Sequence, residues 1–218
     1  MSIQHHPSDE TLLRYAAGRL PAAPGLVVAT HLAGCPACRA RVGAFEAVGG
    51  ALLEQVTPEP MEPEALARLL ALIDSPEPPP RPAPAAKPAP TLPGGMALPA
   101  PLRHCDMGRW RWLGPGVRAS SLTIPQDPSA RLTLLRVGPG RKLPEHGHTG
   151  LEFTQILTGS FSDSFGRYRP GDLSEMDSDI DHQPVVDPDG ECICLTALEG
   201  EMRIGGLFGR LLTSIARL

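Results

Sequence analysis

A proline-rich tract divides this 218-residue chain into two parts that cannot share continuous secondary structure. Residues 75–101 read SPEPPPRPAPAAKPAPTLPGGMALPAP, and 11 of these 27 residues are proline. Proline fixes φ and lacks a backbone N–H, so the tract can form neither a helix nor a central strand. We predict a semi-rigid, partly polyproline spacer between a domain at residues 1–74 and a domain at residues 102–218. A proline-rich docking ligand for a partner protein is the alternative interpretation.

Four segments before the spacer have the periodicity of amphipathic helices. They cover residues 9–20, 22–34, 36–55 and 62–74. Ser8 or Asp9 can cap the first helix, and Pro36 suits the first position of the third. In the fourth helix an apolar stripe is formed by Leu66, Leu69, Leu70 and Ile73. Four short helices bury only a modest core, so this domain would gain stability from an additional cross-link.

The corner between the second and third helices carries His31, Cys35 and Cys38. Positions i, i+4 and i+7 share one face, and thiolates with a neutral imidazole are the ligands that zinc prefers. A helix amino terminus also lowers the pKa of a nearby thiol. The amino-terminal histidine pair offers a fourth ligand: we predict His6, with His5 as the alternative. The pattern predicts a structural Zn²⁺ site. The alternative is two inert thiols beside a histidine whose ring nitrogens are hydrogen-bonded within the protein.

With SDETLLRYAAGRL ahead of them, His6, His31, Cys35 and Cys38 resemble the zinc-binding anti-sigma domain. The resemblance implies a small helical unit that wraps an extracytoplasmic-function sigma factor in a 1:1 complex and blocks its use of RNA polymerase. It also implies a mainly structural metal. The apolar pairs Leu12–Leu13 and Val27–Val28 and the stretch Leu66–Leu70 would then meet the sigma factor, or else fill the core.

After the spacer, short apolar runs alternate with glycine, proline and aspartate turns. The runs RLTLLRV, LEFTQILTGSF and ECICLTAL are separated by turns such as GPG, RPGD and DPDG. This texture predicts an antiparallel all-β sandwich or barrel. Residues 202–218 predict a last strand followed by a short helix.

The segment GRKLPEHGHTGLEFTQILTG, residues 140–159, resembles the first cupin motif at every defined position. His146 and His148 alternate onto one face of a strand, and a turn returns the chain so that Glu152 points the same way. Two imidazoles and a carboxylate inside a barrel form a site for Zn²⁺ or for iron, manganese or nickel. We predict His182, the only downstream histidine, as the fourth ligand.

The second cupin motif is kept only in part. Gly171 and His182 fit it, whereas the usual proline, glycine and asparagine are replaced by Asp177, Asp179 and Val186.

The cysteine count favours metal or redox roles over disulfides, because five cysteines without an export signal make a poor disulfide framework. Cys192 and Cys194 lie on the same face of one predicted strand. They are a possible redox pair or soft metal site, or simply small buried residues. Cys105 has no evident partner.

Charge and hydropathy exclude two classes of partner. The net charge is −4; residues 1–74 carry 5 basic and 8 acidic groups, and residues 102–218 carry 13 and 15. Neither half has the basic excess that phosphate binding needs, so we predict no direct nucleic-acid binding. No apolar stretch is long enough to span a membrane, which predicts a cytoplasmic protein without a membrane partner.

Both halves together resemble the ChrR-type anti-sigma factors. The resemblance implies an α+β multidomain fold: a four-helix zinc anti-sigma domain and a jelly-roll cupin barrel. It implies a regulator, not an enzyme, that holds a group IV sigma factor inactive until singlet oxygen or organic hydroperoxides arise. The alternative is a metal-dependent cupin enzyme, a dioxygenase or isomerase, with an appended helical domain.

A division of labour follows from this arrangement. We expect the helical domain to inhibit and the cupin to act in release. A flexible tether transmits no strain, so release requires either direct contact of the cupin with the complex or exposure of a protease site.

Overall fold

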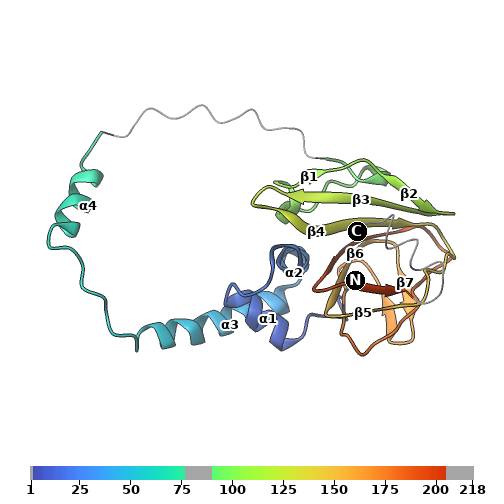
Figure 1. Cartoon of the computed structure of the whole chain (residues 1–218), viewed down its shortest axis with the longest axis horizontal. Coiled ribbons are helices and arrows are strands. Elements are labelled where there is room, and N and C mark those ends of the chain that lie inside the picture. The colour runs from blue at the N-terminus through green and yellow to red at the C-terminus, as the bar shows by residue number, and fades with distance from the viewer. Residues whose placement is uncertain (1, 77–89, 205–218) are drawn as a thin grey trace.

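The computed structural model describes residues 2–76 and 90–204, with helices first and an antiparallel β-domain after them (Figure 1). The helices are α1 Asp9–Ala16, α2 Ala22–Gly34, α3 Pro36–Leu53 and α4 Ala65–Ile73. The Ser8 hydroxyl accepts a hydrogen bond from the Thr11 N–H and caps α1, as predicted. This helix ends earlier than predicted because the chain turns at Gly18, which has φ +64°. None of the described helices is long and apolar enough to cross a membrane.

Helix α4 is present as predicted but contributes nothing to the core. None of its residues is buried, and it lies apart from α1–α3 (Figure 1). Its predicted apolar stripe is exposed along its whole length, from Leu66 at 61% to Ile73 at 71%. The helical core is therefore built by α1, α2 and α3 alone.

The β-domain has one large sheet and two small ones, all antiparallel. The large sheet has the order β1-β3-β4-β11-β6-β9, with β2 paired to β3. Its strands are β1 Asp106–Met107, β2 Arg111–Gly114, β3 Val117–Ile124, β4 Asp127–Val137, β6 Glu152–Thr158, β9 Leu173–Met176 and β11 Cys192–Leu198. The small sheets are formed by β7 Phe161–Asp163, β8 Gly166–Tyr168 and β10 Val185–Val186, and by β5 His146–His148 with β12 Met202–Ile204. Strand β12 matches the predicted last strand; the helix predicted after it lies outside the described residues.

The carboxyl end of the proline tract is packed, although we assigned it to the spacer. Residues 90–102 contain two short 3₁₀ helices, Pro93–Gly95 and Ala100–Leu102. Leu92, Leu98 and Leu102 are 2% exposed or less, because these apolar side chains join the core of the β-domain. Prolines limit hydrogen bonding of a segment, but they do not prevent its leucines from being buried.

The helices dock directly on the β-domain, so the spacer separates the two parts along the chain but not in space (Figure 1). Helix α2 contacts β4, β6 and β11. Val27 and Val28 are fully buried, and they belong to one apolar cluster that continues to Leu195 in β11. The cupin therefore contacts the helices within the chain itself.

Candidate metal centres

The predicted zinc ligands of the helical part converge on one point. His6, His31, Cys35 and Cys38 each offer one ligand atom, and these atoms lie within 4.8 Å of one another. His31 Nε2 lies 3.3 Å from Cys38 Sγ, and His6 Nδ1 lies 3.3 Å from the same sulfur and 3.5 Å from Cys35 Sγ. The alternative ligand, His5, instead faces Asp172 of the β-domain at 3.5 Å.

The state of His31 suits a metal ligand. Burial lowers its pKa, so the imidazole is neutral near pH 7. Its Nδ1–H donates to the Gly171 carbonyl at 3.0 Å, because a carbonyl can only accept. The lone pair of Nε2 therefore points at the thiols.

The Cys38 thiol needs a nearby cation in order to ionise near neutral pH. Burial and the neighbouring Cys35 raise the pKa of Cys38 to about 12, which outweighs the lowering that we expected from the helix amino terminus. A thiolate pair in this buried place is stable only beside a positive charge, and a zinc ion supplies that charge. The donor set and its surroundings fit zinc.

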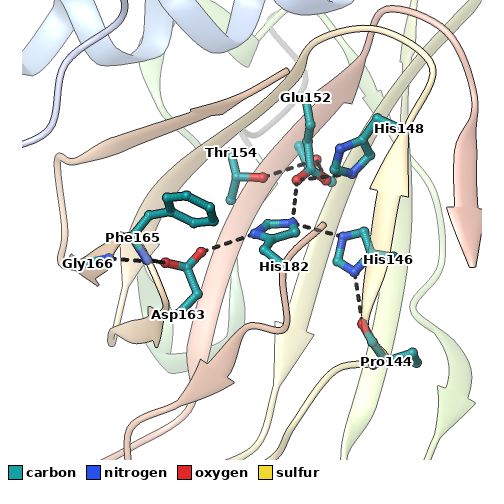
Figure 2. A network of polar contacts seen from close by, with 10 residues as sticks. Pro144, His146, His148, Glu152, Thr154, Asp163, Phe165, Gly166 and His182 are labelled. Carbon is teal, nitrogen blue, oxygen red and sulfur yellow. Dashed lines mark hydrogen bonds and ion pairs between the residues drawn. The ribbon is translucent and has the colours of Figure 1, made fainter. Parts of the chain in front are cut away.

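A second cluster lies inside the β-domain (Figure 2). Its members are His146, His148, Glu152 and His182; all four are buried, and their ligand atoms lie within 4.8 Å of one another. His146 and His182 are paired by two backbone hydrogen bonds of 2.9 and 3.1 Å, which set the fourth predicted ligand opposite the first. Their Nε2 atoms are 3.1 Å apart, and Glu152 Oε2 lies 3.3 Å from His182 Nε2.

Two acceptors orient the histidines of this cluster, and the sequence analysis missed both. Asp163 Oδ2 accepts from His182 Nδ1–H at 3.0 Å, while its other oxygen accepts the N–H groups of Phe165 and Gly166 (Figure 2). The Pro144 carbonyl accepts from His146 Nδ1–H at 2.9 Å. Both contacts leave Nε2 free for a ligand bond. Asp163 lies in a recognisable SDSFG turn, but no local signal indicates that it meets a residue 19 positions away.

Without a bound cation, protonation of His182 balances the negative charge of Glu152 in this cluster. Burial alone would lower the pKa of His182, but hydrogen bonds with Asp163 and Glu152 raise it to about 9. Burial likewise would raise the pKa of Glu152, yet the His182 hydrogen bond and the neighbouring histidines lower it. Neither nitrogen of His148, which is fully buried, has a hydrogen-bond partner among the described residues. A buried imidazole left without a partner beside a carboxylate fits a divalent metal.

Cys192 and Cys194 point to the same side of β11, as predicted, into a cavity of about 650 Å³. The cavity is mainly apolar, and His146, Glu152 and His182 also line it. A hydrogen bond with Cys192, together with burial, raises the pKa of Cys194 well above its usual value. The barrel cluster therefore opens onto a space that can admit a small molecule, whereas the neighbouring Cys194 thiol stays protonated.

Comparisons with known proteins find a match in the helical part of the chain and another in the β-domain. Residues 9–39 match a family described as a putative zinc-finger, and residues 101–200 match the ChrR Cupin-like domain. The chain is 41% identical over 223 residues to the anti-sigma-E factor ChrR of Cereibacter sphaeroides, covering 100% of both chains. Its structure matches ChrR in the crystal structure of Rhodobacter sphaeroides SigE in complex with that anti-sigma factor. That match has a TM-score of 0.72 and 39% identity, and it covers 91% of this chain and 100% of the other.

The fold and the two clusters define a regulatory protein in which a helical zinc-finger domain is docked on a cupin domain. The predicted α+β fold class is thus confirmed. Full-length identity shows the family: this chain belongs to the ChrR anti-sigma factors. It is a regulator and not the cupin enzyme of the alternative interpretation.

Proposed function

We propose that this chain is a zinc-dependent anti-sigma factor that binds one extracytoplasmic-function sigma factor in the cytoplasm and holds it inactive. The observation that carries the proposal is the exposed apolar surface of its helices, in a chain whose ChrR relative is solved as a complex with SigE. Release would follow when singlet oxygen or an organic hydroperoxide acts on the cupin.

The proposed sigma-binding surface is the carboxyl end of α3, the segment after it, and α4. Its large exposed apolar residues are Val48, Leu52, Leu53, Val56, Met61, Leu66, Leu69, Leu70, Leu72 and Ile73. A nine-residue helix is marginal in water without packing, so α4 gains its stability from a partner. Of the faces named from the sequence, Leu12 and Val27–Val28 are buried within the chain, which leaves Leu13 and the α4 stripe for the sigma factor.

The helical zinc would be held by His6, His31, Cys35 and Cys38. When bound, it supplies two negative thiolates with a compensating charge and ties the amino-terminal segment to the α2–α3 corner. The four ligand atoms already lie within 4.8 Å of one another, so the arrangement is close to that of the zinc-bound site.

The cupin centre would be held by His146, His148, Glu152 and His182, with zinc or another divalent metal. When bound, such a metal would hold the four ligands together, and an oxidant that reaches the cavity would act by altering these ligands. Asp163 and Pro144 orient two of the histidines, and the cavity gives a small molecule access. Cys194 is a less reactive target, since a neutral thiol is a poor nucleophile.

A pull-down combined with metal analysis tests the proposal. The full chain should capture an extracytoplasmic-function sigma factor at 1:1 and carry close to two metal ions. Loss of either Cys35 or Cys38 to serine should abolish capture. Capture with unaltered affinity by a Cys35→Ser/Cys38→Ser variant would refute a structural role for the zinc.

A further inference from the structure

The cupin domain touches the helical cluster at the outer nitrogen of one of its histidines. His31 is 1% exposed, and its Nδ1–H donates to the carbonyl of Gly171 at 3.0 Å. Gly171 lies in the turn between β8 and β9, more than one hundred residues away along the chain. The acceptor that orients this histidine is therefore a cupin residue.

The turn that presents this carbonyl is shaped for close approach of the amino-terminal segment. Gly171 has φ +97°, and a Cβ placed on it would lie 2.8 Å from Ile3 Cγ1. Both the backbone conformation and the space therefore require glycine. Ile3 can pack over the turn only because no side chain projects there.

Asp172, the next residue, holds the segment that leads into His6. Its Oδ1 accepts the N–H groups of Gln4 at 2.7 Å and His5 at 3.1 Å, and its Oδ2 accepts the Arg169 N–H at 2.9 Å. The His5 carbonyl in turn accepts the N–H of Leu173 at 3.1 Å. One buried carboxylate thus fixes both the turn that faces His31 and the backbone just before His6.

Two further carboxylates of the cupin hold α1 but do not reach the cysteine cluster. Glu175 in β9 accepts from the Ser8 N–H and hydroxyl at 2.9 and 2.8 Å, and from the Thr11 hydroxyl at 2.9 Å. Glu199 accepts two hydrogen bonds from Arg14, at 2.7 and 3.2 Å. Glu175 and Glu199 therefore dock the helices without supporting the zinc ligands, and they can be compared with Gly171 and Asp172, which contact His31 and the backbone just before His6.

We infer that the cupin supplies the outer shell of the helical zinc centre, with Gly171 and Asp172 as positioning residues for His31 and His6. The inference rests on the proposed zinc site. An acceptor on the outer nitrogen fixes the tautomer of a histidine ligand and raises its basicity, and loss of such a partner costs about 10–100-fold in metal affinity. The docked cupin therefore slows the loss of zinc from the helices.

The test is the rate at which a chelator removes the metal from the helical site of the full chain. Cobalt(II) replaces zinc, because its thiolate charge-transfer band reports only the cluster that contains cysteines; the barrel cluster has none. Asp172→Asn and Gly171→Ala should each speed decay of this band about 10-fold or more. Asp189→Asn, at an 85% exposed carboxylate that is paired with Arg167 of the cupin, is the matched control and should decay like the wild type.

A second variant separates support of the ligands from docking in general. Arg14→Gln removes the ion pair with Glu199 but leaves the turn at Gly171 intact, so its band should decay less than about 3-fold faster than that of the wild type. Wild-type decay in Asp172→Asn, or equal acceleration in Arg14→Gln and Asp172→Asn, would overturn the inference. Absence of a thiolate band in the wild type would instead refute the proposed zinc site itself.

Discussion

The two candidate metal centres have four ligands each but differ in how the chain builds them. The helical cluster takes His6 from the amino-terminal segment and two thiols from a helix corner, and it is supported from outside by the cupin. The barrel cluster takes its ligands from strands β5 and β6 and from His182, which is bridged to His146, and two of its histidines are oriented by acceptors within the same domain. A centre whose ligands come from separate segments of the chain ties a fold together. A centre held on strands beside a cavity is free to meet a small molecule.

The largest expected difference between the centres is in folding of the helices. Cys35→Ser/Cys38→Ser should remove one of about two metal ions and abolish hydrogen-exchange protection of α1 and α3, because structural zinc contributes on the order of 10 kcal/mol to such small domains. Elemental analysis and exchange mass spectrometry measure both effects. His146→Ala/His148→Ala should remove the other metal ion and leave α1 and α3 protected. If both variants lost the same metal ion, the chain would have only one metal centre.

A smaller effect is expected from changes in the proposed sigma-binding surface, which should alter sigma-factor affinity without altering either metal centre. Leu66→Asp/Leu69→Asp should weaken sigma-factor binding by about 100-fold, since burying a leucine is worth about 1.5–3 kcal/mol. The free energy of unfolding of the free chain should change by no more than about 0.5 kcal/mol, because α4 is exposed. Calorimetric titration measures the first and denaturant unfolding the second. Trp112→Ala, at an exposed apolar residue of the barrel, should bind normally. Unchanged affinity in the α4 variant would exclude this surface.

The barrel centre should matter only for release. His146→Ala, Glu152→Ala or His182→Ala should still silence the sigma factor but give a response to singlet oxygen several-fold weaker than the wild type, as read from a reporter that the sigma factor drives. Cys192→Ser/Cys194→Ser should respond nearly as the wild type, because the raised pKa of Cys194 keeps thiolate scarce. Full induction in all three ligand variants would show that this metal plays no part in sensing.

The smallest expected effect is the pH dependence of docking. Burial alone would raise the pKa of Asp172, but backbone N–H groups of Gln4, Arg169 and His5 hold it below its usual value of about 3.9. The stabilisation by this carboxylate is thus fully present above about pH 4 and is lost as pH falls through the lower folded value.

The comparison with Asp172→Asn isolates this contribution. The variant should be less stable than the wild type by about 1–3 kcal/mol at pH 7. This difference should hold down to about pH 5 and shrink below pH 4 in denaturant unfolding. A difference that persists unchanged at pH 3 would contradict the assignment.

The sequence predicted what lies close along the chain and missed what folding brings together. The cap at Ser8, the helix corner of Cys35 and Cys38, and the position of His146 and Glu152 on two consecutive strands all follow from local spacing. The sequence analysis preferred His6 to His5, and folding adds a reason that the sequence does not contain: Asp172 of the β-domain engages His5. Burial of Val27 could not be predicted, because an apolar helix face has the same pattern whether it meets a partner protein or the chain's own cupin.

The roles of Asp163 and Gly171 have the same origin. Asp163 ends strand β7 and Gly171 lies in the turn before β9, and both act on histidines distant in the chain. Their significance arises from β-sheet topology and from docking of the helices, which no local pattern encodes.

Transcription in a purified system tests the central claim most directly. RNA polymerase with the extracytoplasmic-function sigma factor is titrated with the full chain, and run-off transcript is measured. The account predicts complete inhibition near one equivalent by the wild type and by His146→Ala/His148→Ala, and no inhibition by Cys35→Ser/Cys38→Ser. Inhibition by the cysteine variant equal to that of the wild type, or none by the wild type, would contradict a zinc-dependent anti-sigma factor.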